Sequence, residues 1–452
     1  MAGMAPSDST PSARAFVEDL GDFVTASPSS FHAAEETARR FEEAGFVRLA
    51  ERDAWEEADV RGDRVVVRDG SVIAWSMGPD AGPATPWRIV GAHTDSPALK
   101  LKPRPHLVSE GFGQAGVEVY GGPLLNSWLD RDLRLAGRLV LRDGSVRLVA
   151  TGPVARVPQL AVHLDRQVNT EGLRLDPQRH LQPILGLGEE LDPVALLADA
   201  AGVDPVDVAA YDVVTVDAQA PAVIGAREEL FASARLDNLS AVHAGLRALI
   251  EVAGAGDSGA SGRAGGGRTD RATGATAPIA LFVANDHEEV GSASRSGAGG
   301  PFLEDVLVRM HAAIGGDDAS RRRAFATSMV LSCDAGHAAH PNYPERHDPA
   351  NRPRLGGGPL LKINAQQRYA TDAIGAAEFA RACGAAGVPF QEFVSNNAVP
   401  CGSTIGPITA TRLGITTIDA GVALLSMHSA RELCAVADPE MLSAASAAFL
   451  RG

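Results

Sequence analysis

The sequence predicts an α/β protein, in which a mixed sheet with helices on both faces is accompanied by an inserted, mostly β domain. Helix-like and strand-like segments alternate at the beginning of the chain and again in its second half, whereas strand-like segments dominate between them. The length of 452 residues also suits one large core and a second domain. We therefore expect a discontinuous main domain, formed by residues 1–97 and 233–452, and an inserted domain formed by residues 98–232.

The first part of the main domain is expected to contain two helices, a hairpin and a strand. Ser12–Ala26 and Phe31–Ala44 place apolar side chains near helical spacing. Arg64–Met77 contains two β-rich runs around an Asp-Gly pair, which is typical of a hairpin. The short apolar run Trp87–Gly91 then predicts a strand.

The middle of the chain differs, because strand signals replace the alternation of strands and helices. Strands are predicted at Gly116–Tyr120, Leu133–Leu141 and Val146–Ala150, and the last two are joined by an Asp-Gly turn. One helix is predicted at Pro193–Ala201. This part of the chain is therefore expected to form the inserted β domain.

The alternation returns in the second half of the chain. A helix is predicted at Asn238–Val252, and the Gly-rich segment Gly254–Thr276 has few hydrophobic residues, which favours a flexible surface loop. Further strands are predicted at Ile279–Ala284, Met329–Ser332, Leu360–Ile363, Phe390–Val394 and Thr417–Ile418. Further helices are predicted at Pro301–Ala313, Asp372–Cys383, Thr404–Leu413 and Pro439–Leu450. In such a sheet, ligands bind outside the carboxyl ends of the strands.

The composition favours a cytoplasmic protein and argues against several kinds of partner. The formal net charge is −15 and no long run of Lys or Arg occurs, so nucleic acid and anionic membranes are not expected as partners. There is no apolar run of about 18 residues, and the N-terminus lacks the pattern of a signal peptide. The four cysteines share no metal-binding spacing, and so few of them favour a reducing compartment.

Imidazole and carboxylate side chains follow several of the predicted strands: His93 and Asp95, Glu288 and Glu289, Asp334, and His428. A site that activates water needs such ligands at about 2.0–2.2 Å from zinc, and a shared carboxylate can hold two cations roughly 3.5–4 Å apart. In a pair such as Glu288-Glu289, one carboxylate can bind metal while the other acts as a general base. Asp95 can accept a hydrogen bond from the second ring nitrogen of His93 and fix its tautomer.

Each of these residues also has an ordinary structural explanation when it is taken alone. A single His at a strand end is more often a polar residue without a ligand, and Glu-Glu pairs are commonly solvated. Asp237 can simply cap the helix that begins near Asn238. The combination at the ends of successive strands is what favours a metal site.

Segments spread from about residue 12 to residue 450 resemble the successive motifs of the M18 aminopeptidases, in the order of that family. They are Gly91–Pro97, Arg235–Asn238, His287–Ser292, Cys333–Asn342, Lys362–Tyr369, Pro400–Pro407 and Met427–Glu432. The resemblance implies a zinc exopeptidase-like main domain with two zinc ions per subunit, for which Co²⁺ or Mn²⁺ are possible substitutes. It also implies that the inserted domain builds a homo-oligomer, a tetrahedral dodecamer around an enclosed chamber.

The same resemblance implies a role for each candidate residue. The ligands of one zinc are His93, Asp237 and Asp334, and those of the other are Asp237, Glu289 and His428. Glu288 is the general base that takes a proton from the metal-bound water and delivers it to the leaving amine. Asp95 orients His93. The reaction implied is the removal of N-terminal Asp or Glu residues from peptides.

Three further residues are candidates for binding the substrate. An anionic substrate side chain needs a cation or several donors in its pocket. Lysine is scarce in this chain, and Lys362 ends a predicted strand, although a structural lysine explains the sequence equally well. Tyr369 can donate to a developing oxyanion or be a packed aromatic residue. His163 alternates with apolar neighbours on an expected strand, which is typical of a core or interface histidine, and the resemblance suggests that it reaches the active site of a neighbouring subunit.

Two other functions stay open from the sequence. The first is a dinuclear metallo-aminopeptidase of neutral specificity, which a panel of aminoacyl substrates would distinguish. The second is a non-catalytic, self-assembling shell protein, which the presence of all five expected ligands and the base argues against. A serine hydrolase on an α/β fold is set aside, because no Gly-x-Ser-x-Gly motif occurs.

Overall fold

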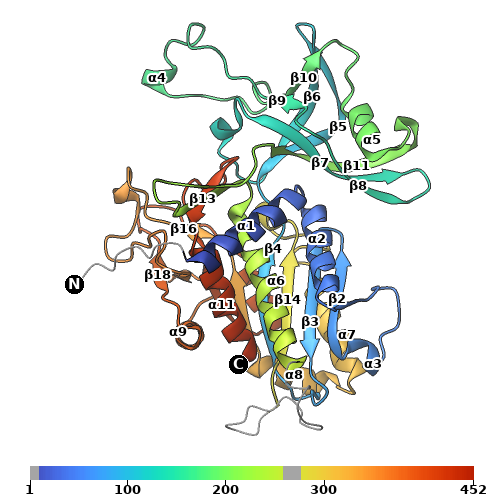
Figure 1. Cartoon of the computed structure of the whole chain (residues 1–452), viewed down its shortest axis with the longest axis vertical. Helices are drawn as coiled ribbons and strands as arrows, with labels where there is room; N and C mark the ends of the chain where they lie inside the picture. Colours follow the sequence, from blue (N-terminus) through green and yellow to red (C-terminus); the bar gives the residue numbers. More distant parts are fainter. Residues whose placement is uncertain (1–9, 258–275) are drawn as a thin grey trace.

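The computed structural model describes residues 10–257 and 276–452, and a nine-stranded sheet organises its larger part (Figure 1). The strands lie in the order β1-β2-β3-β14-β4-β15-β19-β17-β18. Their bounds are β1 Val47–Arg48, β2 Gly62–Arg68, β3 Ser71–Met77, β4 Trp87–His93, β14 Ile279–Asn285, β15 Met329–Cys333, β17 Leu360–Ile363, β18 Gln391–Val394 and β19 Thr416–Gly421. Because β14, β4, β15 and β19 run parallel, their carboxyl ends meet along one edge of the sheet.

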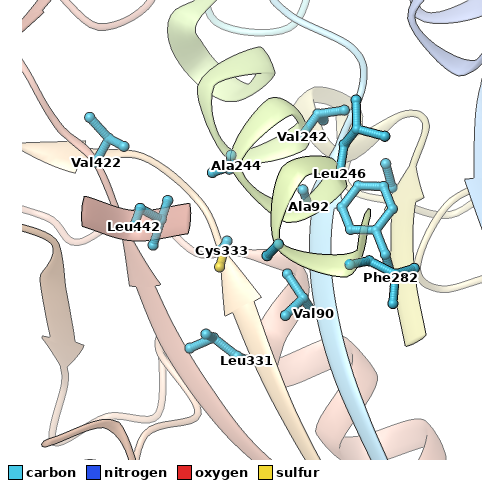
Figure 2. Packing of buried hydrophobic residues seen from close by; sticks show 14 of the residues in the cluster. Val90, Ala92, Val242, Ala244, Leu246, Phe282, Leu331, Cys333, Val422 and Leu442 are labelled. Carbon is cyan, nitrogen blue, oxygen red and sulfur yellow. The ribbon is translucent and has the colours of Figure 1, made fainter. Parts of the chain in front are cut away.

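Helices cover both faces of this sheet. One face carries α1 (Pro11–Ala26), α2 (Ser30–Glu43), α6 (Leu236–Asp257), α9 (Ala373–Ala386) and α11 (Asp438–Arg451), and the other carries α3 (Glu57–Val60), α7 (Phe302–Ala313), α8 (Asp318–Thr327) and α10 (Ile405–Leu413). Alternate residues of a central strand serve the two faces. Val90 and Phe282 pack with α6 (Figure 2), whereas Ile89 packs on the side of α7. The core therefore has one layer on each side of the sheet.

A second sheet lies beyond the carboxyl edge of the first (Figure 1). Its strands are β5 Ala98–Ser109, β6 Phe112–Tyr120, β7 Asp132–Leu141, β8 Val146–Ala150, β9 Ala155–Arg156, β10 Ile184–Leu187 and β11 Val208–Asp217. Strand β11 pairs with both β5 and β7, so this sheet closes on itself. Its own core includes Leu99, Leu133 and Val213 together with Leu197 of α5 (Pro193–Ala201). The short helix α4 (Val168–Glu171) lies on the connection between β9 and β10.

Two small sheets complete the strand pairing. Strands β12 (Ala222–Ile224) and β13 (Leu230–Ser233) pair with β21 (Glu432–Ala435), and β16 (Gly336–His337) pairs with β20 (Ala423–Leu424). These pairings tie segments that are distant in the sequence to the carboxyl edge of the main sheet. Within the described ranges, no helix has both the length and the apolar character needed to cross a lipid bilayer.

The predicted fold class is confirmed, because the main sheet has helices on both faces and a separate, mostly β region accompanies it. Several helices differ from expectation, including the short helices α3 and α4, which were not predicted. Helix α6 extends to Asp257, so Gly254–Asp257 are helical instead of starting the expected loop, and residues 258–275 of that loop lie outside the described residues. Helix α8 was not expected, although Asp317 and Ser320 form a capping box at its start.

The prediction of a strand around His163 is wrong. Residues 162–164 form a turn, His163 is exposed, and Leu160, Val162 and Leu164 are 59%, 48% and 75% exposed. Alternation of apolar side chains buries one side of a segment only where a neighbouring strand or layer receives it. Here the alternating side chains face solvent in the single chain, so His163 is not a core residue.

Gly245 of α6 fits closely against β14 and β4, and we expect its replacement by alanine to destabilise the fold. A Cβ atom at this position would lie 2.5 Å from a ring carbon of Phe282 and 3.1 Å from a methyl carbon of Val90. Overpacking of this kind costs about 1–3 kcal/mol, more than the roughly 0.5–1 kcal/mol that Gly→Ala contributes in a helix. Gly245→Ala should therefore lower the midpoint of thermal unfolding, measured by circular dichroism.

The matched control is Gly254→Ala on an exposed position of the same helix, where an added Cβ meets nothing within 4 Å. This variant should keep or raise the unfolding midpoint. Equal midpoints for the two variants would contradict the close packing described at Gly245.

Candidate metal centre

The parallel strands bring four of the predicted site residues to one edge of the main sheet. His93 is the last residue of β4, and Asp334 directly follows β15. Glu288 and Glu289 follow β14 in a short 3-10 helix, Glu288–Val290. Since β4, β14 and β15 are parallel neighbours, their side chains beyond the strand ends converge.

Two residues reach the same place from outside the strands. Asp237 lies at the beginning of α6, and His428 lies in the connection between β20 and β21. His428 has a left-handed backbone, with φ 66°. The sheet therefore supplies one part of the cluster, and a helix start and a turn supply the other.

The Asp237 carboxylate lies between the two histidines. Its Oδ1 is 3.4 Å from Nε2 of His93, and its Oδ2 is 3.4 Å from Nε2 of His428. Asp334 Oδ1 lies 3.5 Å from Nε2 of His93, and Glu289 Oε2 lies 3.5 Å from Nε2 of His428. Three groups of potential ligands result: two of them share Asp237, and the third joins His93 to Glu288 and Glu289.

Buried polar atoms that lack a hydrogen-bond partner in the described part of the chain make these residues suitable for binding zinc. His93 Nε2, Asp237 Oδ1 and Glu289 Oε1 are buried and have no hydrogen-bond partner among the described residues. Leaving such an atom unpaired costs about 1–3 kcal/mol, and more where a charge is involved. Burial and the charge of Asp237 also raise the pKa of Glu289 well above its usual value, because a further negative charge is unfavourable there. Imidazole and carboxylate ligands converging on one point are the donor set that zinc takes.

Asp95 lies beside His93, but the hydrogen bond expected from the His93 ring to the Asp95 carboxylate goes to the Asp95 backbone carbonyl. Its Oδ1 accepts a hydrogen bond from the backbone N–H of Glu288 at 3.0 Å, and its Oδ2 accepts from the N–H of Glu289 at 3.1 Å. Oδ2 also accepts from the Tyr120 hydroxyl at 2.8 Å. The Nδ1–H of His93 donates to the backbone carbonyl of Asp95 at 3.1 Å, with Oδ1 at 3.4 Å. Nδ1 therefore carries the proton, and Nε2 is left as the ligand atom.

Glu288 lies beside the ligands with its Oε2 4.0 Å from Nε2 of His93. Burial raises the pKa of Glu288 to about 7, against the effect of His93 and with a smaller contribution from the charge of Asp334. A carboxyl group whose pKa lies near neutrality can both take up and release a proton at that pH. The chemistry available to Glu288 is therefore proton transfer at the edge of the ligand cluster.

Lys362 and Tyr369 lie next to the first ligand group. The Lys362 side chain is buried, donates from Nζ to the Ala335 carbonyl at 2.6 Å, and lies 3.3 Å from Asp334 Oδ2. The Tyr369 ring centre is 5.3 Å from the same Nζ, and burial raises the pKa of the Tyr369 phenol. His163 is different, because it lies in an exposed turn of the second sheet region.

Glu432 is a further site residue, and sequence reasoning gave it no role. Its Oε2 accepts from the backbone N–H of Asp237 at 2.8 Å, and its Oε1 accepts from the backbone N–H of His428 at 2.7 Å. The side chain is buried, so one carboxylate sets the relative position of two candidate ligands. Its place at the end of the segment Met427–Glu432 was the only signal, because bonds to backbone N–H groups leave no pattern in the sequence.

Comparison with known protein sequences relates the chain to one family. A family model described as aminopeptidase I zinc metalloprotease (M18) matches residues 23–450. A probable M18 family aminopeptidase 2 of Streptomyces coelicolor is 53% identical over 443 residues, which cover 97% of this chain and 98% of that protein. A probable M18 family aminopeptidase 2 of Mycobacterium tuberculosis (H37Rv) is 44% identical over 95% of this chain and 97% of that protein.

Solved structures have the same overall arrangement. The chain resembles one from a cryo-EM structure of an Ape4 and Nbr1 complex with a TM-score of 0.89 and 33% identity, covering 97% of this chain and 86% of that one. It resembles a chain of the S. cerevisiae mApe1 dodecamer with a TM-score of 0.81 and 26% identity, covering 97% of both.

Glu432→Gln is expected to weaken zinc binding. A glutamine amide has one acceptor oxygen, and its NH₂ group cannot accept, so the N–H of Asp237 or of His428 would lose its partner. Changes in groups that orient metal ligands typically reduce metal affinity about 10–100-fold. Competition with a chromogenic chelator would measure the dissociation constants for zinc.

The matched control is Asp438→Asn. Asp438 is also a buried carboxylate that accepts from two backbone N–H groups, those of Gly356 at 2.9 Å and Gly358 at 3.1 Å. Asp438→Asn should lower the unfolding midpoint as Glu432→Gln does, but it should leave the zinc affinity unchanged. Equal zinc affinities in the two variants would refute the positioning role of Glu432.

Proposed function

The chain belongs to the M18 family of zinc aminopeptidases, and we propose that it is a dinuclear zinc aminopeptidase that removes N-terminal Asp or Glu residues from peptides. One observation carries the proposal of two metal ions. The two oxygens of the Asp237 carboxylate face Nε2 of His93 and Nε2 of His428, each at 3.4 Å. A carboxylate in this position can hold two cations at once.

The chain's own residues would hold the two ions in two overlapping groups. The ligands of one zinc would be His93, Asp237 and Asp334, and those of the other would be Asp237, Glu289 and His428. When bound, zinc polarises a carbonyl oxygen and lowers the pKa of water. Co²⁺ or Mn²⁺ should be able to substitute, because imidazole and carboxylate ligands do not select strongly among these ions.

Glu288 would act as the general base and then as the general acid. Its carboxylate would take a proton from the attacking water and deliver it to the nitrogen of the departing amine. The position of Glu288 supports this role. Its Oε2 lies 4.0 Å from Nε2 of His93, and Glu288 belongs to neither of the two ligand groups that contain Asp237. Its backbone N–H is held by Asp95, which fixes where the carboxylate can reach.

Lys362 would recognise the acidic side chain of the substrate, and Tyr369 would donate a hydrogen bond to the developing oxyanion. An ammonium group has three N–H donors, and the internal contacts of Lys362 Nζ are the Ala335 carbonyl and Asp334 Oδ2. One donor therefore stays available to an incoming carboxylate. Tyr369 lies on the same side and can add a hydroxyl donor.

The protein would work as a cytoplasmic homo-oligomer, built as a tetrahedral dodecamer. Support for assembly comes from large apolar side chains exposed in the second sheet region, among them Leu160, Leu164 and Leu187, and from the likeness to the mApe1 dodecamer. In such an assembly the exposed His163 would reach the active site of a neighbouring subunit. All four cysteines are free, as a reducing compartment requires.

The proposed activity can be tested with chromogenic amides of Asp, Glu, Leu and Ala. We expect purified protein to cleave only the Asp and Glu amides, to lose activity on chelation and to regain it with zinc. Glu288→Gln should lower kcat by about 10²–10⁴-fold while zinc content stays unchanged. Glu392→Gln, an exposed change on β18, serves as the control.

Two outcomes would redirect the assignment. Cleavage of the Leu or Ala amide instead would keep the metal site and replace the acidic preference by a neutral one. A fully zinc-loaded protein that cleaves none of the four amides would favour the non-catalytic shell.

Lys362→Met tests the acidic preference at one residue. Loss of a charged hydrogen bond of about 1.5–3 kcal/mol corresponds to roughly a 10–150-fold lower kcat/KM for Asp amides. Zinc content should stay unchanged. The control is Lys100→Met, because Lys100 pairs with Asp212 at 3.0 Å in the second sheet region. If Lys362→Met lowers the zinc content instead, Lys362 positions Asp334 and does not bind the substrate.

A further inference from the structure

We propose that Tyr120 at the end of strand β6 and the two residues that follow it, Gly121 and Gly122, form a positioning element that holds the proposed metal-binding histidines His93 and His428 in place from the second sheet region. The proposal rests on the proposed dinuclear site. The element belongs to the inserted β region, whereas both histidines belong to the main sheet and its connections. A segment of three residues would thus help to orient both halves of the metal centre.

Tyr120 acts on the first histidine through Asp95. Its hydroxyl donates to Asp95 Oδ2 at 2.8 Å. The same Asp95 receives the Nδ1–H of His93 at its backbone carbonyl and the N–H groups of Glu288 and Glu289 at its carboxylate. Tyr120 is the one side chain from the second sheet in this set of contacts. Without its hydroxyl, the Asp95 carboxylate loses a restraint on its rotation, which loosens its 3.4 Å contact with Nδ1 of His93 and its hydrogen bonds from the Glu288 and Glu289 N–H groups.

Gly122 acts on the second histidine directly. The Nδ1–H of His428 donates to the Gly122 carbonyl at 2.9 Å, because a carbonyl can only accept. This bond fixes the proton on Nδ1 and leaves Nε2, which faces Asp237 and Glu289, free to bind a metal ion. The Leu124 N–H also donates to the His428 carbonyl at 2.9 Å. His428 is therefore held at its ring by Gly122 and at its backbone by Leu124, two residues further along the chain.

Gly121 limits how far Glu289 can move. Its φ is +71°, and a Cβ atom added there would lie 3.1 Å from Cβ of Glu289. A glycine at this position lets the backbone approach the ligand closely. The three residues together thus contact, directly or through Asp95, ligands of both groups that share Asp237.

Tyr120→Phe tests the first contact, with Tyr211→Phe as its matched control. Tyr211 lies in the same sheet, and its hydroxyl donates to the Lys102 carbonyl at 2.6 Å, among residues that are not ligands. Both changes remove one hydroxyl and one hydrogen bond. We expect Tyr120→Phe to raise the dissociation constant of at least one zinc ion about 10–100-fold, and Tyr211→Phe to leave both constants unchanged.

Gly121→Ala tests the second contact, with Gly111→Ala as its matched control. Gly111, in the turn between β5 and β6, also has a positive φ, +78°, but a Cβ atom added there meets nothing within 4 Å. Alanine is therefore strained by the positive φ in both variants, but only in Gly121→Ala does the added Cβ atom crowd Glu289. We expect Gly121→Ala to weaken zinc binding and to change the visible absorption of the Co²⁺-loaded protein. Gly111→Ala should change neither.

The readouts are zinc stoichiometry, zinc dissociation constants from chelator competition and the Co²⁺ spectrum, with unfolding midpoints to compare each variant with its control. Weaker zinc binding than in the controls, at equal unfolding midpoints of the metal-free proteins, is the result expected. Zinc constants equal to those of the controls in both variants would overturn the positioning role. An unaltered protein that binds fewer than two zinc ions would overturn the proposed dinuclear site itself, and this result is distinguishable because it needs no variant.

Discussion

The accumulation of buried carboxylates at one edge of the main sheet is the constraint on which the other features depend. Asp237, Glu289 and Asp334 surround two imidazole rings, and Glu288 is close by. In a protein interior such negative charges repel one another and lose the stabilisation that water gives them, as the raised pKa of Glu289 reflects. Cations between these oxygens remove both penalties. Metal binding should therefore contribute to folding stability as well as to the chemistry.

The backbone of the site is held in place by two carboxylates outside the candidate ligand groups, which accept hydrogen bonds from backbone N–H groups. Asp95 joins the end of β4 to the 3-10 helix that carries Glu288 and Glu289, through two backbone N–H groups. Glu432 joins the start of α6 to the His428 turn in the same way. Bonds between a charged acceptor and backbone donors are stronger than neutral ones, and they hold the main chain itself. These hydrogen bonds thus fix the backbone positions of the residues whose side chains are the candidate ligands.

Sequence reasoning found the residues whose position follows from strand periodicity. His93 and Asp334 end or follow apolar parallel strands, and such strand ends must meet at one edge of the sheet. Asp237 follows no strand of that sheet, so its place among the expected ligands rested on the family resemblance. Glu432 acts through backbone groups, which no residue pattern encodes. The strand expected around His163 was wrong, because apolar alternation looks the same whether a segment is buried in its own chain or left exposed.

The insertion point explains how a second sheet can hold a metal centre at all. Strand β5 begins at Ala98, three residues after Asp95, and Ala98 pairs with Tyr120 in the β5–β6 ladder. The position of the Tyr120 hydroxyl is therefore set by a short covalent connection and one register. A slip of one residue in this ladder would turn Tyr120 to the opposite face of the sheet and remove the contact with Asp95. The geometry of the proposed ligands therefore depends on the register of the inserted sheet.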